Sequence, residues 1–245
     1  MSPEEGLARL RALGFGGDDA AALWAHFDDA ERRGKLGHGH ARIVWLETLE
    51  GLQPAARPEK TAAAPGFDHW DGRGALGYLT LAAICSDLAE RPPAPARVVT
   101  ASHCFPTGML GYWVRWLADA GLVALLTTTS PPRLAHPAGG PPLVGTNPLA
   151  IGIPSGEGRP IVVDVSPAKA TWGDVIAGRA SPEDVVPFGG EDAHKAFALA
   201  VGLQLLVDSS VEGYGAFLVA MAPEFGEVAD AFRERAGDVR LPGDS

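Results

Sequence analysis

Residues Leu143 to Trp172 have the sequence L-V-G-T-N-P-L-A-I-G-I-P-S-G-E-G-R-P-I-V-V-D-V-S-P-A-K-A-T-W and decide the fold class of this chain. Two short apolar runs within the stretch, Leu149–Ile153 and Ile161–Val165, are expected to form strands. Gly-Thr-Asn-Pro precedes the first run, and Asp-Val-Ser-Pro ends the second. Polar side chains at strand ends are typical of a small-molecule site on a rigid scaffold. The stretch therefore predicts two strands with a ligand site beside them.

Helices and strands are expected to alternate on both sides of this stretch. Upstream, a helix over Met109–Ala120 precedes a strand over Leu122–Thr128. Downstream, a long apolar helix over His194–Val207 precedes a strand at Ala216–Ala220 and an amphipathic helix over Phe225–Arg235. Alternation of this kind favours an α/β fold.

The first 66 residues are expected to form a helical segment followed by a linker. Ser2-Pro3-Glu4-Glu5 is a helix start, and further helices are expected over Asp18–Arg33 and Arg42–Glu50. The Pro- and Ala-rich stretch Gln53–Gly66 is interpreted as a linker. We therefore divide the chain into an N-terminal helical segment with substrate-site residues (1–66), an α/β domain for cofactor and substrate (67–225), and a C-terminal helix and tail that pack back on the site (226–245).

Bulk composition excludes several classes of partner. The 245 residues suffice for one large domain or two small ones, and the net charge of −10 without a basic block argues against nucleic acid. No apolar run approaches bilayer length, and the N-terminus lacks the pattern of a signal peptide. Two cysteines are too few for a disulfide framework. We expect a cytoplasmic protein without a membrane partner.

Five separated stretches carry a family resemblance. They are R-G-K-L-G-H-G-H-A-R (33–42), A-S-H-C-F (101–105), G-G-P-P-L-V-G-T-N-P (139–148), V-D-V-S-P-A-K-A-T-W-G-D-V (163–175), and P-F-G-G-E-D-A-H-K-A (187–196) paired with R-L-P-G-D (240–244). In this order the chain resembles the malate/L-lactate dehydrogenases that lack a Rossmann fold, and within them the branch that reduces cyclic imino acids. The resemblance implies a non-Rossmann NAD(P)-binding α/β fold, NADPH or NADH as cofactor, and a homodimer.

Adding hydride to a C=N or C=O bond beside a carboxylate requires a cationic clamp, an acid–base group and a grip on the nicotinamide cofactor. Arg42 is the candidate clamp, because a guanidinium binds a carboxylate bidentately. His38 is the candidate acid–base group, because an imidazole titrates near neutral pH. Taken alone, the two residues fit a surface helix arginine and a loop histidine without a role; their match to the family's Ser-His-Gly-x-x-Arg segment favours the site.

Asp174 bears on the substrate class. A carboxylate stabilises a protonated imine, whereas it opposes the negative charge that develops on oxygen during ketone reduction. Family members that act on hydroxy acids often have lysine at this position, and the imino-acid branch has Gly-Asp, as in Gly173-Asp174 here. Two alternatives remain open: Asp174 orients His38 by a hydrogen bond, or it is an aspartate at the start of a short helix over Thr171–Arg179, stabilised by the helix dipole.

The resemblance implies further binding residues. The substrate or the nicotinamide is expected to contact His103, Thr146 and Asn147, with Pro148 holding Asn147 extended, although Gly-Thr-Asn-Pro is also an ordinary turn sequence. Cofactor contacts are expected from Ser130, Asp164, Val165, Ser166, His194, Lys195, Arg240, Pro242 and Gly243. A solvated lysine at a helix start is the other interpretation of Lys195.

Three other patterns are set aside. G-R-G-A-L-G at 72–77 satisfies G-x-G-x-x-G, but F-D-H-W-D before it is not expected to be a buried strand, and no acidic residue follows at the usual distance. His38 and His40 lack a third ligand at metal-binding spacing, so no metal is expected. Cys104 is adjacent to His103 in sequence, and adjacent side chains rarely face each other as a nucleophile and base do.

Departures from the family pattern keep three functions open. Gly37, Cys104 and Ala196 replace family residues, and the chain is shorter than typical members. The shorter length is expected to affect cofactor binding and the dimer interface before it affects the fold. The leading prediction is an NAD(P)H-dependent reductase of a Δ1-piperideine- or Δ1-pyrroline-2-carboxylate. One alternative is a malate/lactate-like dehydrogenase of 2-oxo and 2-hydroxy acids. The other is a shortened, redox-inactive family member that acts as a binding protein.

Overall fold

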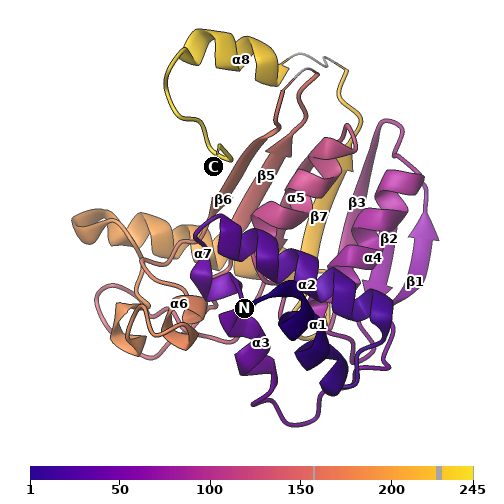
Figure 1. Cartoon of the computed structure of the whole chain (residues 1–245). Helices are drawn as coiled ribbons and strands as arrows, with labels where there is room; N and C mark the ends of the chain where they lie inside the picture. The colour runs from indigo at the N-terminus through magenta and orange to yellow at the C-terminus, as the bar shows by residue number, and fades with distance from the viewer. Residues whose placement is uncertain (157, 225–227, 245) are drawn as a thin grey trace.

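The computed structural model describes residues 1–156, 158–224 and 228–244. Its centre is a seven-stranded sheet with the order β1-β2-β3-β7-β4-β5-β6 (Figure 1). The strands are β1 (Glu59–Ala64), β2 (Phe67–Asp71), β3 (Ala96–Ser102), β4 (Val123–Thr128), β5 (Leu149–Ile153), β6 (Ile161–Val165) and β7 (Ala216–Met221). The α-helices are α1 (Pro3–Ala12), α2 (Gly17–Arg32), α3 (Ala41–Leu46), α4 (Gly77–Glu90), α5 (Leu110–Asp119), α6 (Trp172–Ile176), α7 (Ala193–Asp208) and α8 (Val228–Ala236). Short 3₁₀ turns are η1 (Leu36–His38), η2 (Pro182–Asp184) and η3 (Gly190–Asp192).

The two strands that were expected from the central stretch have the predicted bounds. β5 and β6 pair in antiparallel register, with Leu149 opposite Val165 and Ile153 opposite Ile161. This register brings the residues before β5 beside the residues after β6. The polar side chains of both segments therefore lie at one edge of the sheet.

One face of the sheet forms the main core. Alternate residues of β4, β5 and β7 are buried there, because successive side chains of a strand point to opposite faces. Helix α5 packs on β4, β5 and β6, and α4 packs beside α5 (Figure 1). Helix α7 contacts β4 and β7 and lies behind the sheet in this view. The structure thus confirms the predicted mixed α/β fold.

The N-terminal helices cover the helical layer, and α2 contacts both α4 and α5. Ser2 caps α1 by accepting a hydrogen bond from the backbone N–H of Glu5 at 3.2 Å, as the sequence predicts. Helix α2 buries the expected face of Leu23, Phe27 and Ala30. Helix α3 ends at Leu46, four residues before the predicted end.

The linker prediction is wrong for Glu59–Ala64, which form β1. This edge strand is almost fully exposed, so no alternation of apolar residues marked it. The prediction that F-D-H-W-D is no buried strand is also wrong, because Phe67–Asp71 form β2 between β1 and β3. Its Asp68 is buried in ion pairs with Lys60 and Arg97, so the polar composition concealed a strand in the interior of the sheet.

The G-x-G-x-x-G sequence therefore does follow a strand and precede α4. Its glycines serve close backbone packing, since a Cβ atom on Gly77 would lie 2.7 Å from the carbonyl oxygen of Pro106 and 2.8 Å from the carbonyl carbon of Cys104. The backbone of the 104–106 loop thus occupies the place beside Gly77.

At the C-terminal end, α8 begins at Val228, whereas the first three residues of the predicted helix Phe225–Arg235 lie outside the described residues. The tail then returns to the edge of the sheet, where the backbone N–H of Val162 donates a hydrogen bond to the carbonyl of Pro242 at 3.1 Å. Among the helices described in the structure, none is both long and apolar enough to cross a bilayer.

The contact between β5 and α5 depends on a glycine. A Cβ atom at Gly152 would approach the carbonyl oxygen of Val114 more closely than real Cβ atoms do. We expect Gly152→Ala to lower the free energy of unfolding by about 1–3 kcal/mol, because α5 must move away from the sheet. Urea denaturation measures this loss.

The matched control is Gly202→Ala on the exposed face of α7, where an added Cβ meets no atom within 4 Å. This variant should be as stable as the parent or more stable by up to about 1 kcal/mol. Equal free energies of unfolding for the two variants would contradict the proposed packing constraint.

Candidate active site

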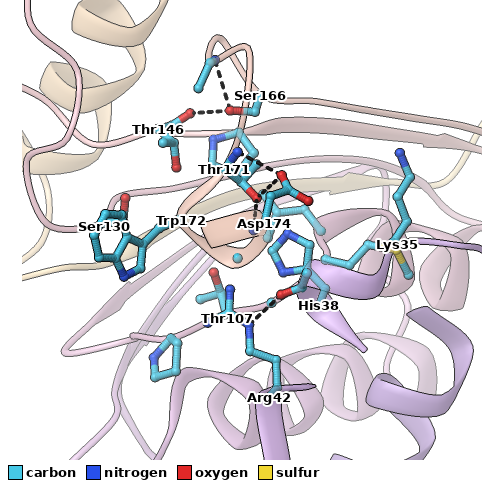
Figure 2. Close-up of a pocket in the computed structure, with 18 of the residues that line it drawn as sticks. Lys35, His38, Arg42, Thr107, Ser130, Thr146, Ser166, Thr171, Trp172 and Asp174 are labelled. Carbon is cyan, nitrogen blue, oxygen red and sulfur yellow. Dashed lines mark hydrogen bonds between the residues drawn. The ribbon is translucent and has the colours of Figure 1, made fainter. Parts of the chain in front are cut away.

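A cavity of about 400 Å³ opens where η1, α6 and the ends of the central strands meet (Figure 2). The loop at 105–109 forms a further wall. Seven of the residues selected from the sequence line this cavity: His38, Arg42, Ser130, Thr146, Asp164, Ser166 and Asp174. Segments that are distant in the sequence thus contribute side chains to one cavity.

The ends of β5 and β6 are tied together at the cavity wall. The Ser166 hydroxyl donates a hydrogen bond to the Thr146 carbonyl at 3.1 Å and accepts one from the Ala168 backbone at 3.1 Å. These bonds fix the Gly-Thr-Asn-Pro segment against the segment that follows β6. The Thr146 side chain is then held beside the cavity by the scaffold (Figure 2).

The turn η1 meets α6 through two glycines. A Cβ atom on Gly37 would lie 2.7 Å from the Gly173 carbonyl carbon and 2.8 Å from the Asp174 nitrogen. A Cβ atom on Gly173 would lie 2.5 Å from the Gly37 carbonyl oxygen. The two backbones are therefore in direct contact, with no room for a side chain at either position. This contact brings His38 and Asp174 to the same part of the cavity.

Arg42 is buried, and its guanidinium is held by a hydrogen bond and by contact with an aromatic ring. Its Nε donates to the Gly37 carbonyl at 2.8 Å, and its guanidinium carbon lies 5.1 Å from the centre of the Trp45 ring. Among the described residues, no carboxylate pairs with Arg42. Its terminal NH₂ groups are therefore available to a ligand carboxylate.

His38 is half-buried, and its Nδ1 atom, which is buried, has no hydrogen-bond partner among the described residues. Burial lowers the pKa of His38 well below its usual value, and the positive charge of Arg42 lowers this pKa further. The imidazole is therefore neutral near pH 7. A neutral imidazole has one N–H donor and one acceptor nitrogen to offer a ligand.

Asp174 both caps α6 and lines the cavity. Its Oδ2 accepts hydrogen bonds from the backbone N–H and the hydroxyl of Thr171, at 2.9 and 2.8 Å. These bonds form a capping box, so the interpretation as an aspartate at a helix start is correct for this oxygen. Its Oδ1 lies toward η1, 3.0 Å from the position of a Cβ on Gly37. No hydrogen bond joins Asp174 to His38 in the described structure.

Asp164 belongs to β6, and its carboxylate lies beside the first turn of α5. Its Oδ2 accepts a hydrogen bond from the Gly111 backbone at 2.7 Å, near the positive end of that helix. Burial nevertheless raises the pKa of Asp164, because removal from water disfavours the charged form. Asp164 thus caps a helix as well as lining the cavity.

Two predicted substrate contacts lie elsewhere. Asn147 is fully buried, and its Nδ2 donates to the Ala200 carbonyl at 3.2 Å and to Gln204 at 2.8 Å. The expectation that Pro148 holds Asn147 extended is wrong, because Asn147 has a φ of +29°, a region that asparagine tolerates. His103 pairs with Asp71 at 3.0 Å and lines a second space of about 300 Å³.

Several predicted cofactor contacts also lie outside the cavity. Val165 is exposed, and Lys195 pairs with Asp192 at 2.8 Å on the surface, as in the alternative interpretation of a solvated helix-start lysine. Arg240 donates to the Asp244 carbonyl. The predicted site residues that do not line this cavity are His103, Asn147, Val165, His194, Lys195, Arg240, Pro242 and Gly243.

The cavity residues without a predicted role include three cations and two tryptophans: Lys35, Arg133, Arg179, Trp45 and Trp172. Four of the six charged side chains in the lining are cations, namely Lys35, Arg42, Arg133 and Arg179, against Asp164 and Asp174. Among the described residues, none of the four cations forms an ion pair with a carboxylate. The lining therefore carries excess positive charge that suits an anionic ligand.

The patterns that were set aside have structural roles. His40 stacks on Trp24 with ring centres 4.9 Å apart, and no group of three His, Cys, Asp or Glu side chains suited to a metal occurs among the described residues. Burial raises the pKa of the Cys104 thiol to about 12, so this cysteine stays protonated.

Comparison with known proteins identifies the family. The family model for malate/L-lactate dehydrogenase matches residues 6–193. The chain belongs to the malate/L-lactate dehydrogenase family. Solved structures of the family have the same fold: delta1-piperideine-2-carboxylate reductase from Pseudomonas syringae has a TM-score of 0.80 at 24% identity, covering 98% of this chain and 88% of that one.

Curated relatives in the family differ in the substrates that their names state. (2R)-3-sulfolactate dehydrogenase (NADP(+)) from Chromohalobacter salexigens is 29% identical over 184 residues, which cover 73% of this chain and 55% of that protein. A Delta(1)-pyrroline-2-carboxylate/Delta(1)-piperideine-2-carboxylate reductase from Pseudomonas putida is 30% identical over 218 residues, covering 76% of this chain and 62% of that protein. The chain thus spans little more than half the length of these relatives.

Another histidine, His26, is fully buried in this member of the dehydrogenase family. It supports the 107–109 loop in the wall of the cavity. The Met109 backbone donates to His26 Nε2 at 3.1 Å, and a Cβ on Gly108 would overlap the rings of His26 and Tyr78. Burial lowers the pKa of His26 to about 3. The neutral imidazole therefore accepts the hydrogen bond that holds this loop.

The depressed pKa of His26 makes stability depend on pH. An unfolded histidine binds its proton below about pH 6.5, whereas folded His26 stays neutral down to about pH 3. Its contribution is therefore complete above pH 6.5 and is lost as the pH falls toward 3. We expect His26 to account for a loss of about 2 kcal/mol in unfolding free energy between pH 8 and pH 5.

Urea denaturation at several pH values measures this loss. His26→Gln should flatten the dependence, because an amide can accept the Met109 bond without titrating. His136→Gln, at an exposed histidine, should leave the dependence unchanged. A His26→Gln curve parallel to that of the parent would show that His26 is not the titrating group.

Proposed function

We propose that this protein is an NAD(P)H-dependent reductase that adds hydride to the C=N bond of a cyclic imino acid of the Δ1-piperideine- or Δ1-pyrroline-2-carboxylate type. The observation that carries the proposal is the presence of Arg42, His38 and Asp174 in the lining of one cavity. Each supplies one requirement of the reaction: a carboxylate clamp, a hydrogen-bonding group for the reacting nitrogen, and a negative charge for the protonated imine.

Arg42 binds the substrate carboxylate in this mechanism. Its Nε is already engaged by the Gly37 carbonyl, which fixes the plane of the guanidinium. The NH₂ groups then donate hydrogen bonds to the carboxylate in a defined orientation, and the adjacent C=N carbon is placed in the cavity. Trp45 beneath the guanidinium limits its movement.

The protonation states of the other two residues favour an imine over a ketone. His38, with its lowered pKa, is neutral near pH 7, so it does not repel a cationic C=NH⁺ group and can accept a hydrogen bond from it. The carboxylate of Asp174 stabilises that cation. A ketone would instead develop negative charge on its oxygen, which a neutral imidazole stabilises less than an imidazolium does and which the carboxylate of Asp174 opposes.

The charges and hydroxyl groups of the cavity lining also suit an anionic dinucleotide. Four cations without carboxylate partners in the described chain suit phosphate groups, and hydroxyl groups of Ser130, Thr146 and Ser166 line the same space. We assign the cofactor grip to these hydroxyl residues together with Asp164. A bound NADPH or NADH would supply the hydride.

Two alternatives make different predictions. A 2-oxo acid dehydrogenase would use the same Arg42 clamp, and similarity to a sulfolactate dehydrogenase supports this alternative. A redox-inactive binding protein is the other alternative, because the chain spans little more than half of its curated relatives. Failure to bind NADH and NADPH in a fluorescence titration would favour the binding protein.

The direct test is consumption of NADPH or NADH by the purified protein. Oxidation of the cofactor is expected with preformed Δ1-piperideine-2-carboxylate or Δ1-pyrroline-2-carboxylate. Little oxidation is expected with pyruvate or malate-like 2-oxo acids alone. The reverse preference would replace the imine proposal with the dehydrogenase alternative.

The charge of Asp174 gives a sharper test. Asp174→Asn should lower kcat/KM for the imine by about 100-fold or more, because a charge at about 4 Å in a partly screened site is worth a few kcal/mol. Any activity on a 2-oxo acid should fall less. Equal losses on both substrates would remove the charge argument.

A control for the capping role of Asp174 is Asp184→Asn. Asp184 forms the equivalent capping box with Ser181 in η2 and does not line the cavity. Both variants should lose a similar, small amount of unfolding free energy, about 1 kcal/mol. Only Asp174→Asn should lose imine reduction.

A further inference from the structure

Two cavity residues have no individual role in the chemistry above: Arg133, counted there only among the four lining cations, and Trp172. The guanidinium carbon of Arg133 lies 3.7 Å from the centre of the Trp172 ring, and both residues line the cavity. Arg133 also lies outside the five stretches that carry the family resemblance. None of the residue roles implied by that resemblance covers it.

The stack is held in place by packing. Trp172 is half-buried and packs against a small apolar cluster that includes Leu134, Val144 and Ala168. The Arg133 backbone N–H donates to the Val144 carbonyl at 2.8 Å, so the main chain on both sides of the stack is anchored. A guanidinium on a fixed indole loses little further freedom when it binds a ligand.

The charge of Arg133 has no acidic partner in the described part of the chain. Most arginines of this acidic protein do pair, for example Arg9 with Glu47 and Arg97 with Asp68. Stacking engages the flat face of a guanidinium, whereas its N–H donors lie in the plane. Arg133 therefore retains donors that can point to an oxygen acceptor in the cavity.

The surroundings of the stack are polar on the cavity side. Figure 2 shows Ser130 beside Trp172, and Lys35 on the other side of Asp174. Lys35 and the Arg42 clamp thus line different parts of the cavity. A ligand with a single carboxylate would satisfy Arg42 and leave Arg133 unpaired.

We propose that Arg133, stacked on Trp172, is a second anion-binding position of the cavity and binds an oxyanion of the ligand in addition to the carboxylate held by Arg42. This inference rests on the proposed function for the identity of the ligands. The oxyanion has two sources, a phosphate of the dinucleotide or a second carboxylate of a dicarboxylic substrate. Both offer paired oxygens to the planar guanidinium.

Binding titrations of the full chain test the proposal without turnover. The probes are NADPH, NADH and inorganic pyrophosphate for the phosphate source, glutarate for a dicarboxylate, and pyrrole-2-carboxylate as a monocarboxylate. The variant is Arg133→Met, which keeps the length of the side chain and removes its charge. The matched control is Arg235→Met, since Arg235 lies 5.3 Å from the Phe232 ring centre on α8, outside the cavity lining.

Arg133→Met should raise the dissociation constant about tenfold to a hundredfold for one class of probe, because a charge-assisted pair is lost. Weaker binding of the dinucleotides and pyrophosphate identifies the phosphate source, and weaker binding of glutarate alone identifies the dicarboxylate. Binding of pyrrole-2-carboxylate should not change in either case. Trp172→Leu should weaken the same class, because the guanidinium loses its platform.

Two results would overturn the proposal. One is unchanged dissociation constants for every probe in Arg133→Met, or losses no larger than those of Arg235→Met. The other is no binding of any probe other than pyrrole-2-carboxylate by the parent protein. Failure of imine reduction is a separate result, since Arg133-dependent anion binding would persist in a protein that does not catalyse this reaction.

Discussion

The site depends on the direct backbone contact between Gly37 and Gly173. The Gly37 carbonyl oxygen lies against Gly173 and also accepts the hydrogen bond from Arg42 Nε at 2.8 Å. One carbonyl group thus joins the turn that carries His38, the helix that carries Asp174 and the clamp Arg42. As a departure from the family's serine, Gly37 suggested lost function. In the structure it is the residue that lets the N-terminal segment close on the α/β core.

Electrostatics follows from this closure. Partial burial of His38 lowers its pKa, and the nearby charge of Arg42 lowers this pKa further, so the imidazole stays neutral. The chain as a whole carries a net charge of −10, yet its cavity lining has four cations and two carboxylates. The buried charge of Arg42, which has no carboxylate partner among the described residues, is costly unless a ligand balances it. The cavity is therefore organised for anionic ligands, while the small region around His38 and Asp174 suits a cation.

Sequence patterns predicted the strands that have runs of apolar residues, and they missed the strands that are exposed or that bury charged side chains. β5 and β6 have the predicted bounds because apolar runs end at Pro, Gly and Ser residues on both sides. β1 is exposed, and β2 buries Asp68 by pairing it with cations, so neither strand shows an apolar pattern. Ion pairing across strands is a tertiary property that no local window contains.

The same distinction separates the site residues. His38, Arg42 and Asp174 were selected by motif, and all three line the cavity. The polar groups of Asn147 and His103 are instead engaged by Gln204 and Asp71, partners that are distant in sequence. Arg133 and Lys35 are marked only by the lack of a carboxylate partner in the described structure, which no sequence pattern reveals.

Asp174 shows why structural and functional interpretations of a residue need not compete. The two oxygens of its carboxylate have different surroundings: Oδ2 accepts two hydrogen bonds from Thr171, and Oδ1 lies toward η1. The capping bonds fix the side-chain torsions, so the second oxygen is presented to the cavity without further loss of conformational entropy. A carboxylate that was free to rotate would be solvated and would stabilise a cation less well. The helix cap is therefore the means by which this chain orients the charge that the proposed reaction requires.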